Sequence, residues 1–215
     1  LPGDKWGSVL FNPSYFAPNE YRVFGEVTGK VDDWARVVDR GYEIIAKSLN
    51  QASGNADNGL VPAWCDENGT PTEPFAGGPT NYQYDSARMP FRLGVDYCFY
   101  SEPRAKQYLD KTSAFFAAIG ATQISDGYDL DGTPHPDPAT PAGSPQSAVF
   151  VGSGAVGAMS DPARLAFVEA AYAEVATGEL LARSRYYSLS WTALTLLMMS
   201  GNLLDYTRPD SGKAP

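Results

Sequence analysis

The stretch YQYDSARMPFRLGVDY, residues 82–97, places a carboxylate where a loop enters an apolar helical run. Asp85 directly follows Tyr84 and precedes Arg88 by three residues, which is close to one helical turn. A cation near a carboxylate favours its ionised form, and an ionised carboxylate can remove a proton from water. The residues therefore make Asp85 a candidate for carboxylate chemistry, with Arg88 as the cation that would keep it ionised.

A second interpretation of Asp85 requires no chemistry. Aspartate is a favoured N-cap residue, and a helix predicted over 86–101 would begin directly after it. The residues alone leave both interpretations open.

Composition excludes several other kinds of chemistry. The 215 residues carry 16 basic and 25 acidic side chains, a formal charge of −9, without the Lys/Arg cluster that a nucleic-acid partner would require. The longest apolar run, around 193–199, is too short to span a bilayer, so no membrane partner is expected. One histidine and two cysteines are too few for a His-based triad or a zinc cluster, so neither metal nor cofactor is expected.

The two cysteines, Cys65 and Cys98, allow two interpretations. A disulfide would suit an exported protein and would attach the loop around Cys65 to the helix after Asp85, whereas two buried free thiols fit the same sequence. The chain begins with Leu1 rather than Met, so we expect an upstream segment in the natural protein. We also expect a secreted or periplasmic location, which a disulfide would suit.

Helical spacing of apolar residues dominates the chain, for example over 34–49 and 108–119. Proline stands at predicted helix starts, as at Pro103, and glycine at predicted ends, as at Gly120. These signals predict about seven helices, over 18–28, 31–49, 86–101, 103–120, 145–159, 161–177 and 185–200. Short turns alternate with long loops rich in Gly, Pro and Asn, which is typical of an all-α toroid with its long loops at one face.

The long loop over 52–85 concentrates aromatic side chains in a polar, glycine-rich setting. Aromatic rings can stack on the C–H face of a sugar while nearby carboxylates and amides bind its hydroxyls. We therefore expect Trp64, Tyr82 and Tyr84 to serve a carbohydrate site.

Five segments, in order, resemble successive blocks of glycoside hydrolase family 8: NPSYFAPNEYRVF, WARVVDRGYEII, NGLVPAW, YDSARMPFRLGVDY and RYYSLSWTALTLLMMSGNL. The resemblance implies an (α/α)6 barrel and an inverting endo-β-1,4-glucanase, with xylanases and chitosanases as relatives. It identifies residues 1–215 as the C-terminal part of one catalytic domain, an incomplete toroid with about seven of twelve expected helices and no second domain.

The family pattern also implies roles for individual residues. Its Tyr-Asp-x-x-Arg block falls on Tyr84, Asp85 and Arg88, with Asp85 as the general base. An aromatic pair that lines the family's cleft corresponds to Trp6 and Tyr15, which with Trp64 and Tyr82 are the expected substrate contacts.

Two departures from the family pattern affect the expected activity. The family's Val-Pro-Asp-Trp block has Ala63 in place of Asp, and no segment matches the block that supplies the general acid. We therefore expect the chain to act on a polysaccharide only with the missing N-terminal part of the barrel, or otherwise to self-associate. A non-catalytic carbohydrate-binding remnant and a purely structural helical scaffold are the alternatives.

Overall fold

A computed structural model describes residues 10–138, 146–176, 180, 186–205 and 207. Within these ranges the protein is all-α, with isolated β-bridges but no strand. The α-helices are α1 (Pro18–Thr28), α2 (Val31–Ser48), α3 (Met89–Tyr100), α4 (Pro103–Ile119), α5 (Ala148–Ala158), α6 (Leu165–Ala176) and α8 (Tyr186–Met199). Single 3-10 turns occur at η1 (Pro13–Tyr15), η2 (Ala121–Gln123) and η3 (Pro162–Arg164). The predicted all-α class is confirmed, and each predicted helix corresponds to one of these seven, with ends shifted by a few residues.

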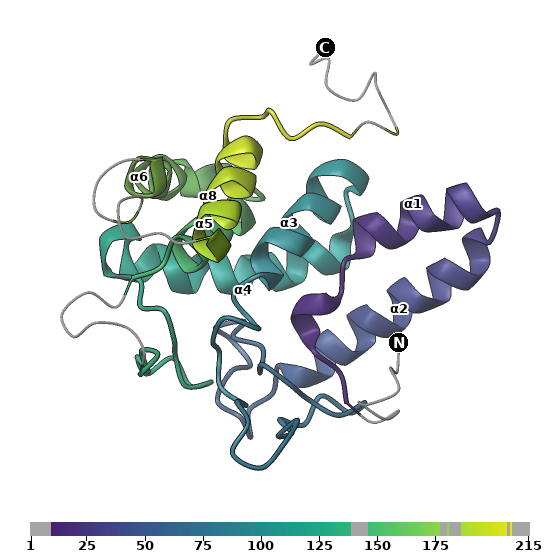
Figure 1. Cartoon of the computed structure of the whole chain (residues 1–215), viewed down its shortest axis with the longest axis horizontal. Coiled ribbons are helices and arrows are strands. Elements are labelled where there is room, and N and C mark those ends of the chain that lie inside the picture. Colours follow the sequence, from purple (N-terminus) through teal and green to yellow (C-terminus); the bar gives the residue numbers. More distant parts are fainter. Residues whose placement is uncertain (1–9, 139–145, 177–179, 181–185, 206, 208–215) are drawn as a thin grey trace.

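The helices form two layers (Figure 1). One layer contains α1, α3, α5 and α8, which contact one another in that order. The other three helices pack behind this layer: α2 contacts α1, whereas α4 and α6 both contact α5. Successive helices run back and forth between the layers, as the short turns after α1 and α3 require. This is part of a helical toroid, in agreement with the predicted architecture.

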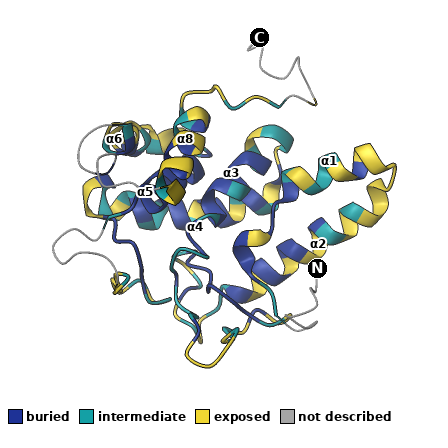
Figure 2. Ribbon diagram, viewed as in Figure 1, coloured by how far each residue is buried: buried dark blue, intermediate teal, exposed yellow. Residues whose placement is uncertain are grey.

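Helix α5 is the centre of the packing, and every one of its 11 residues is buried (Figure 2). Its sequence AVFVGSGAVGA is small and apolar on all sides, as expected for a helix surrounded by others. Glycine allows the closest approach, because a Cβ added at Gly152 would lie 2.5 Å from Oγ1 of Thr195 on α8. Larger residues on α5 would push α8 away from the layer.

The long loops gather at one end of the helices (Figure 1). A β-bridge joins Phe11 to Cys65, and a second joins Tyr82 to Tyr128, with both backbone hydrogen bonds of the second bridge at 2.9 Å. The segment before α1, the loop before α3 and the loop after α4 are therefore held together. This end of the molecule contains the predicted site residues.

A buried ionic cluster connects the first four helices. Asp96 on α3 is fully buried and binds Arg22 of α1 through both carboxylate oxygens, at 2.9 and 3.1 Å. The Tyr42 hydroxyl of α2 donates to Asp96 at 2.6 Å, while Arg22 and Arg104 both bind Glu102 at the start of α4. Because each buried charge has an opposite charge and hydrogen bonds, the cluster fixes the relative positions of these helices.

The layer of α1, α3 and α8 has an apolar face with no helix against it among the described residues. A cavity of about 270 Å³ opens there, lined by Asn19, Glu20, Phe91, Arg92, Val95, Phe99, Trp191, Leu194, Leu203 and Leu204. Phe24 and Val27 on α1 and Leu197 on α8 are also exposed. No described helix is long and apolar enough to cross a membrane.

Of the two interpretations of the cysteines, the disulfide is wrong, and only one of the two free thiols is buried. Both cysteines are free: Cys65 is buried beside its bridge to Phe11, whereas Cys98 is exposed on α3. The two thiols therefore have different surroundings. Burial raises the pKa of the Cys65 thiol to about 12.

The thiols should differ in reactivity. The thiolate is the reactive form, so iodoacetamide at neutral pH should alkylate Cys98 and leave Cys65 unmodified until the protein is denatured. Mass measurement before and after denaturation, without reductant, tests this. Equal labelling of both cysteines in the native protein, or of neither after denaturation, would contradict the structure.

The ionic cluster should make stability depend on pH. The hydrogen bond from Arg104, together with that from Arg22, lowers the pKa of Glu102 from 4.5 to about 2 in the folded protein. A lowered folded-state pKa stabilises the protein above pH 4.5, and that contribution is lost as pH falls from about 4.5 to about 2. Urea denaturation across this window should show a smaller pH dependence for Glu102→Gln, but an unchanged one for the control Glu67→Gln on the exposed loop.

Candidate active site

Asp85 and Arg88 form an ion pair at the start of α3. Nη2 of Arg88 lies 2.8 Å from Oδ1 of Asp85, and the two side chains are 14% and 32% exposed. Arg88 occupies the N-cap position of α3, and the Asp85 carboxylate accepts hydrogen bonds from side chains instead of capping the helix. The capping interpretation of Asp85 is therefore wrong. The carboxylate is accessible to solvent and has a cation beside it.

Two further donors contact the other carboxylate oxygen. Nε1 of Trp64 and Nε2 of Gln83 each lie 3.3 Å from Oδ2 of Asp85, which is long for a hydrogen bond. The Asp85 amide donates in turn to the Gln83 side chain at 3.2 Å. Both oxygens of Asp85 are thus oriented by neighbours from three positions in the chain, and the carboxylate keeps lone pairs for an incoming water.

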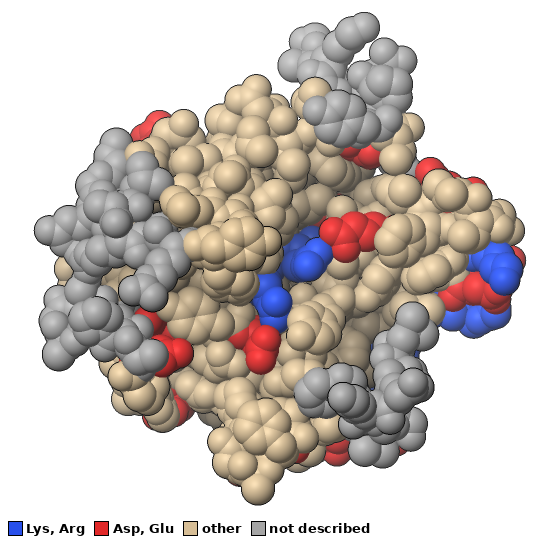
Figure 3. Space-filling model, viewed as in Figure 1, with Lys and Arg blue, Asp and Glu red and all other residues tan. Residues whose placement is uncertain are grey.

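An open aromatic ring lies next to this ion pair. Tyr15, in η1, is 57% exposed, and the Arg88 guanidinium lies 5.2 Å from its ring centroid. The edge of Trp64 meets the same ring, with centroids 6.1 Å apart. In Figure 3 the middle of the visible face is hollowed, and basic and acidic groups lie in the hollow between largely uncharged surfaces. An aromatic surface beside a solvent-accessible carboxylate can bind a sugar ring.

Tyr84 faces away from Asp85. Its hydroxyl donates to Oδ2 of the buried Asp126 at 3.2 Å, and its ring packs edge-on against Phe150 and Tyr187 at 5.2 and 6.0 Å. Burial, with the negative charge of Asp126 adding to it, raises the pKa of Tyr84 to about 12. Tyr84 therefore stays protonated and forms one wall of the site.

The other three predicted substrate contacts, Tyr82, Trp64 and Trp6, have different outcomes. Tyr82 has no exposed surface and packs against Phe116 and Phe150, so the expectation that it contacts substrate is corrected: its ring belongs to the core. Trp64 is only 8% exposed and contributes its indole N–H to the site instead of an open ring face. Trp6 lies outside the described residues.

Sequence reasoning missed several residues of the site. Ser14 contacts Arg88, Gln83 contacts Asp85, and Tyr187 contacts Tyr84. Nothing in the spacing of Gln83 or Tyr187 distinguishes them from other loop or helix residues. Ser14 is 71 positions before Asp85, so only the fold relates them.

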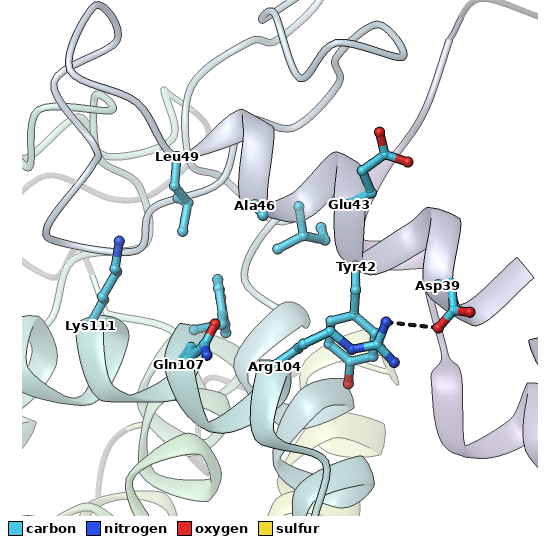
Figure 4. Close-up of a pocket in the computed structure, with 10 residues that line it drawn as sticks. Asp39, Tyr42, Glu43, Ala46, Leu49, Arg104, Gln107 and Lys111 are labelled. Atoms are coloured by element: carbon cyan, nitrogen blue, oxygen red, sulfur yellow. Dashed lines mark hydrogen bonds and ion pairs between the residues drawn. The ribbon is translucent and has the colours of Figure 1, made fainter. Parts of the chain in front are cut away.

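A separate cavity lies between α2 and α4. It encloses about 340 Å³ and is lined by Asp39, Tyr42, Glu43, Ile45, Ala46, Leu49, Arg104, Gln107, Tyr108 and Lys111. Figure 4 shows the Arg104 guanidinium at the rim, bound to Asp39 at 2.8 Å. None of the lining residues contacts Asp85 or Arg88, so this cavity is separate from the ion pair at the start of α3.

Known proteins are similar to this chain over most of its length. The family profile described as Glycosyl hydrolases family 8 matches residues 1–201. Endoglucanase A of Acetivibrio thermocellus is 36% identical over 202 residues, which are 94% of this chain and 39% of that protein. Endoglucanase C of Ruminiclostridium cellulolyticum is 39% identical over 159 residues, or 74% of this chain and 31% of that protein.

A solved structure shares the fold. The apo structure of a β-1,3-1,4-glucanase from Paenibacillus sp. X4 superposes with a TM-score of 0.78 at 27% identity, over 92% of this chain and 51% of that chain. This chain thus spans about half of that glucanase, and less than half of the two endoglucanases. The matched profile covers nearly all of it, and so the chain belongs to glycosyl hydrolases family 8.

Proposed function

We propose that Asp85 is the general base of an inverting endoglucanase that cleaves β-1,4-glucan chains. The observation that carries this proposal is the Asp85 carboxylate itself, 32% exposed and 2.8 Å from Arg88, beside the open ring of Tyr15. Two relatives are named endoglucanases and the solved relative is a β-1,3-1,4-glucanase, which favours a β-glucan as substrate.

Inversion requires a second carboxyl group. A general acid protonates the leaving oxygen while the base activates a water on the opposite side of the sugar ring, with the two groups roughly 6.5–9.5 Å apart. On this scheme Asp85 removes a proton from the water, and Arg88 holds the carboxylate ionised before substrate arrives. Tyr15 provides the stacking surface that places the anomeric carbon over the water.

Three glutamates that are held by cations, Glu20, Glu43 and Glu102, are poor candidates for the acid. Hydrogen bonds from Lys47 and Arg40 lower the pKa of Glu43 to about 2, and the Arg104 cluster does the same to Glu102. Glu20 is bound to Arg92 at 2.8 Å. A general acid must carry a proton at the working pH, so we propose that it comes from a part of the protein outside this chain.

The apolar face of α1, α3 and α8 also favours a further part of the protein packed against this chain. Its cavity and exposed side chains, such as Leu194 and Leu204, would be covered by the remaining helices of the barrel or by a second copy of the chain. We also propose that the protein is exported to the cell surface, the medium or the periplasm, where polymeric glucan is accessible.

A carbohydrate-binding protein without catalysis is the second candidate, because the exposed ring of Tyr15 would serve sugar binding alone. An enzyme acting on xylan or chitosan would use the same base. The presence of hydrolysis separates the first possibility from the proposal, and the relative rates on glucan, xylan and chitosan separate the second.

Asp85→Asn tests the proposed base. The amide keeps the size of the side chain but cannot accept the proton, so turnover of β-glucan by the complete enzyme should fall by roughly 10²–10⁴-fold, with oligosaccharide binding retained. Asp33→Asn is a matched control, because Asp33 forms an exposed i,i+3 ion pair with Arg36 on α2. NMR of the first product should show an inverted anomeric carbon; retention, or an Asp85→Asn enzyme with near-normal turnover, would refute the assignment.

The isolated chain tests the proposed division of the site. Without the acid it should not hydrolyse carboxymethyl cellulose above background, and its apolar face should make it associate. Size-exclusion chromatography with light scattering should therefore give a mass above the 23.1 kDa of one chain. A monomer that hydrolyses the polymer would contradict both expectations.

A further inference from the structure

We propose that Ser14 is a positioning residue for the base: its buried hydroxyl holds the Arg88 guanidinium against Asp85. The inference rests on the proposed role of Asp85. Ser14 lies in the 3-10 turn before α1 and has no exposed surface, so it does not touch substrate and acts only through Arg88.

The hydrogen bonds of Asn12 determine which way the Ser14 hydroxyl points. The Ser14 amide donates to Oδ1 of Asn12 at 3.0 Å, and because a backbone N–H can only donate, that atom must be the amide oxygen. Oγ of Ser14 lies 2.8 Å from the same oxygen and donates its proton there. The lone pairs of Ser14 Oγ are then left to accept from Nη2 of Arg88 at 2.5 Å.

Arg88 has few other restraints. A single nitrogen, Nη2, bridges Ser14 Oγ and Asp85 Oδ1, at 2.5 and 2.8 Å. The Nε atom is buried without a hydrogen-bond partner among the described residues, and the ring of Tyr15 contacts the guanidinium face without fixing its rotation in the plane. Loss of the Ser14 hydroxyl would leave Asp85 as the single described side-chain acceptor for Arg88.

The turn that carries Ser14 is itself well anchored. The side chain of Asn12 caps it, the backbone of Phe11 bridges to Cys65, and Phe16 packs edge-on against Tyr42 at 5.0 Å. Ser14 therefore provides a fixed acceptor from outside α3. By contrast, the i,i+3 pair of Arg36 and Asp33 has both side chains more than half exposed and no such support, which is the usual case of a weak surface pair.

The expected consequence is a loss in turnover rather than in substrate binding. If Arg88 rotates away, Asp85 keeps its exposure and its contacts to Trp64 and Gln83, but the cation no longer fixes Oδ1. The carboxylate would then be misplaced for the water while Tyr15 still binds the sugar. We expect Ser14→Ala to lower kcat by about 10- to 100-fold, the range for a lost charge-assisted hydrogen bond, with KM changed less than about 2-fold.

A double-mutant cycle in the complete enzyme tests this inference, with β-glucan as substrate. Ser14→Ala and Arg88→Met are made singly and together, and Ser14→Cys is added because it keeps the side-chain volume but offers a weak acceptor. Ser48→Ala is the matched control: Ser48 is also fully buried, but its hydroxyl bonds the Ile45 carbonyl within α2. Ser14→Ala should have no further effect on kcat in the Arg88→Met background.

Three results would overturn the inference. These are a normal kcat for both Ser14 variants, equal losses in Ser14→Ala and Ser48→Ala, and full additivity of the Ser14→Ala and Arg88→Met effects. Thermal melts identify any variant that does not fold, and Ser14→Cys then replaces Ser14→Ala in the cycle. Asp85→Asn is measured in parallel. If it retains turnover the proposed function fails, whereas if it loses turnover and Ser14 has no effect only the positioning role fails.

Discussion

The buried carboxylate of Asp96 is the constraint on which the arrangement of the helices depends. A buried charge is costly unless it is paired and hydrogen-bonded, and Asp96 meets that requirement only when Arg22 of α1 and Tyr42 of α2 approach α3 together. Asp96 stands eight residues after Arg88 on the same helix, about 12 Å along its axis. Placing α3 against α1 for the sake of Asp96 therefore also brings Arg88 to the turn that precedes α1.

The ion pair of Asp96 with Arg22 and that of Asp85 with Arg88 have different roles, because Asp96 is buried and Asp85 is partly exposed. Asp96 has no accessible surface and every oxygen has a partner inside the protein, so its charge serves structure. Asp85 is 32% exposed, and its partner Arg88 is held on the protein side by Ser14. A carboxylate that is fixed on one side and open to water on the other meets the physical requirement for a general base.

Some features of this protein could be predicted from local sequence, and others could not. Apolar periodicity and Pro/Gly signals located the helices, and the spacing of Asp85 and Arg88 predicted their contact, because both depend on residues within a few turns. The ring of Tyr82 was wrongly expected to contact substrate, and the pairing of Cys65 and Cys98 stayed open, since burial and facing direction depend on how distant loops close. The loop that contains Tyr82 is polar and rich in glycine, so its sequence resembles that of an exposed loop. The bridge between Tyr82 and Tyr128 nevertheless holds the ring of Tyr82 in the core. Ser14 could not be found at all, because its partner is 74 residues away.

The position of the proposed base, at the end of the two helical layers where the long loops gather, has a further consequence for the proposed chemistry. Inversion places acid and base on opposite sides of the scissile bond, so the two groups need not share one structural unit. In this chain the loop that carries Asp85 is bridged to Phe11 and Tyr128 and packs against Phe150 of α5. The apolar face of α1, α3 and α8 is left uncovered among the described residues. A second group of helices that covers this face would complete the hydrophobic packing and bring its own loops to the same end of the barrel. Burial of that face and assembly of the two-carboxyl site would then be one event, and the chain alone would hold a correctly built base with no acid opposite it.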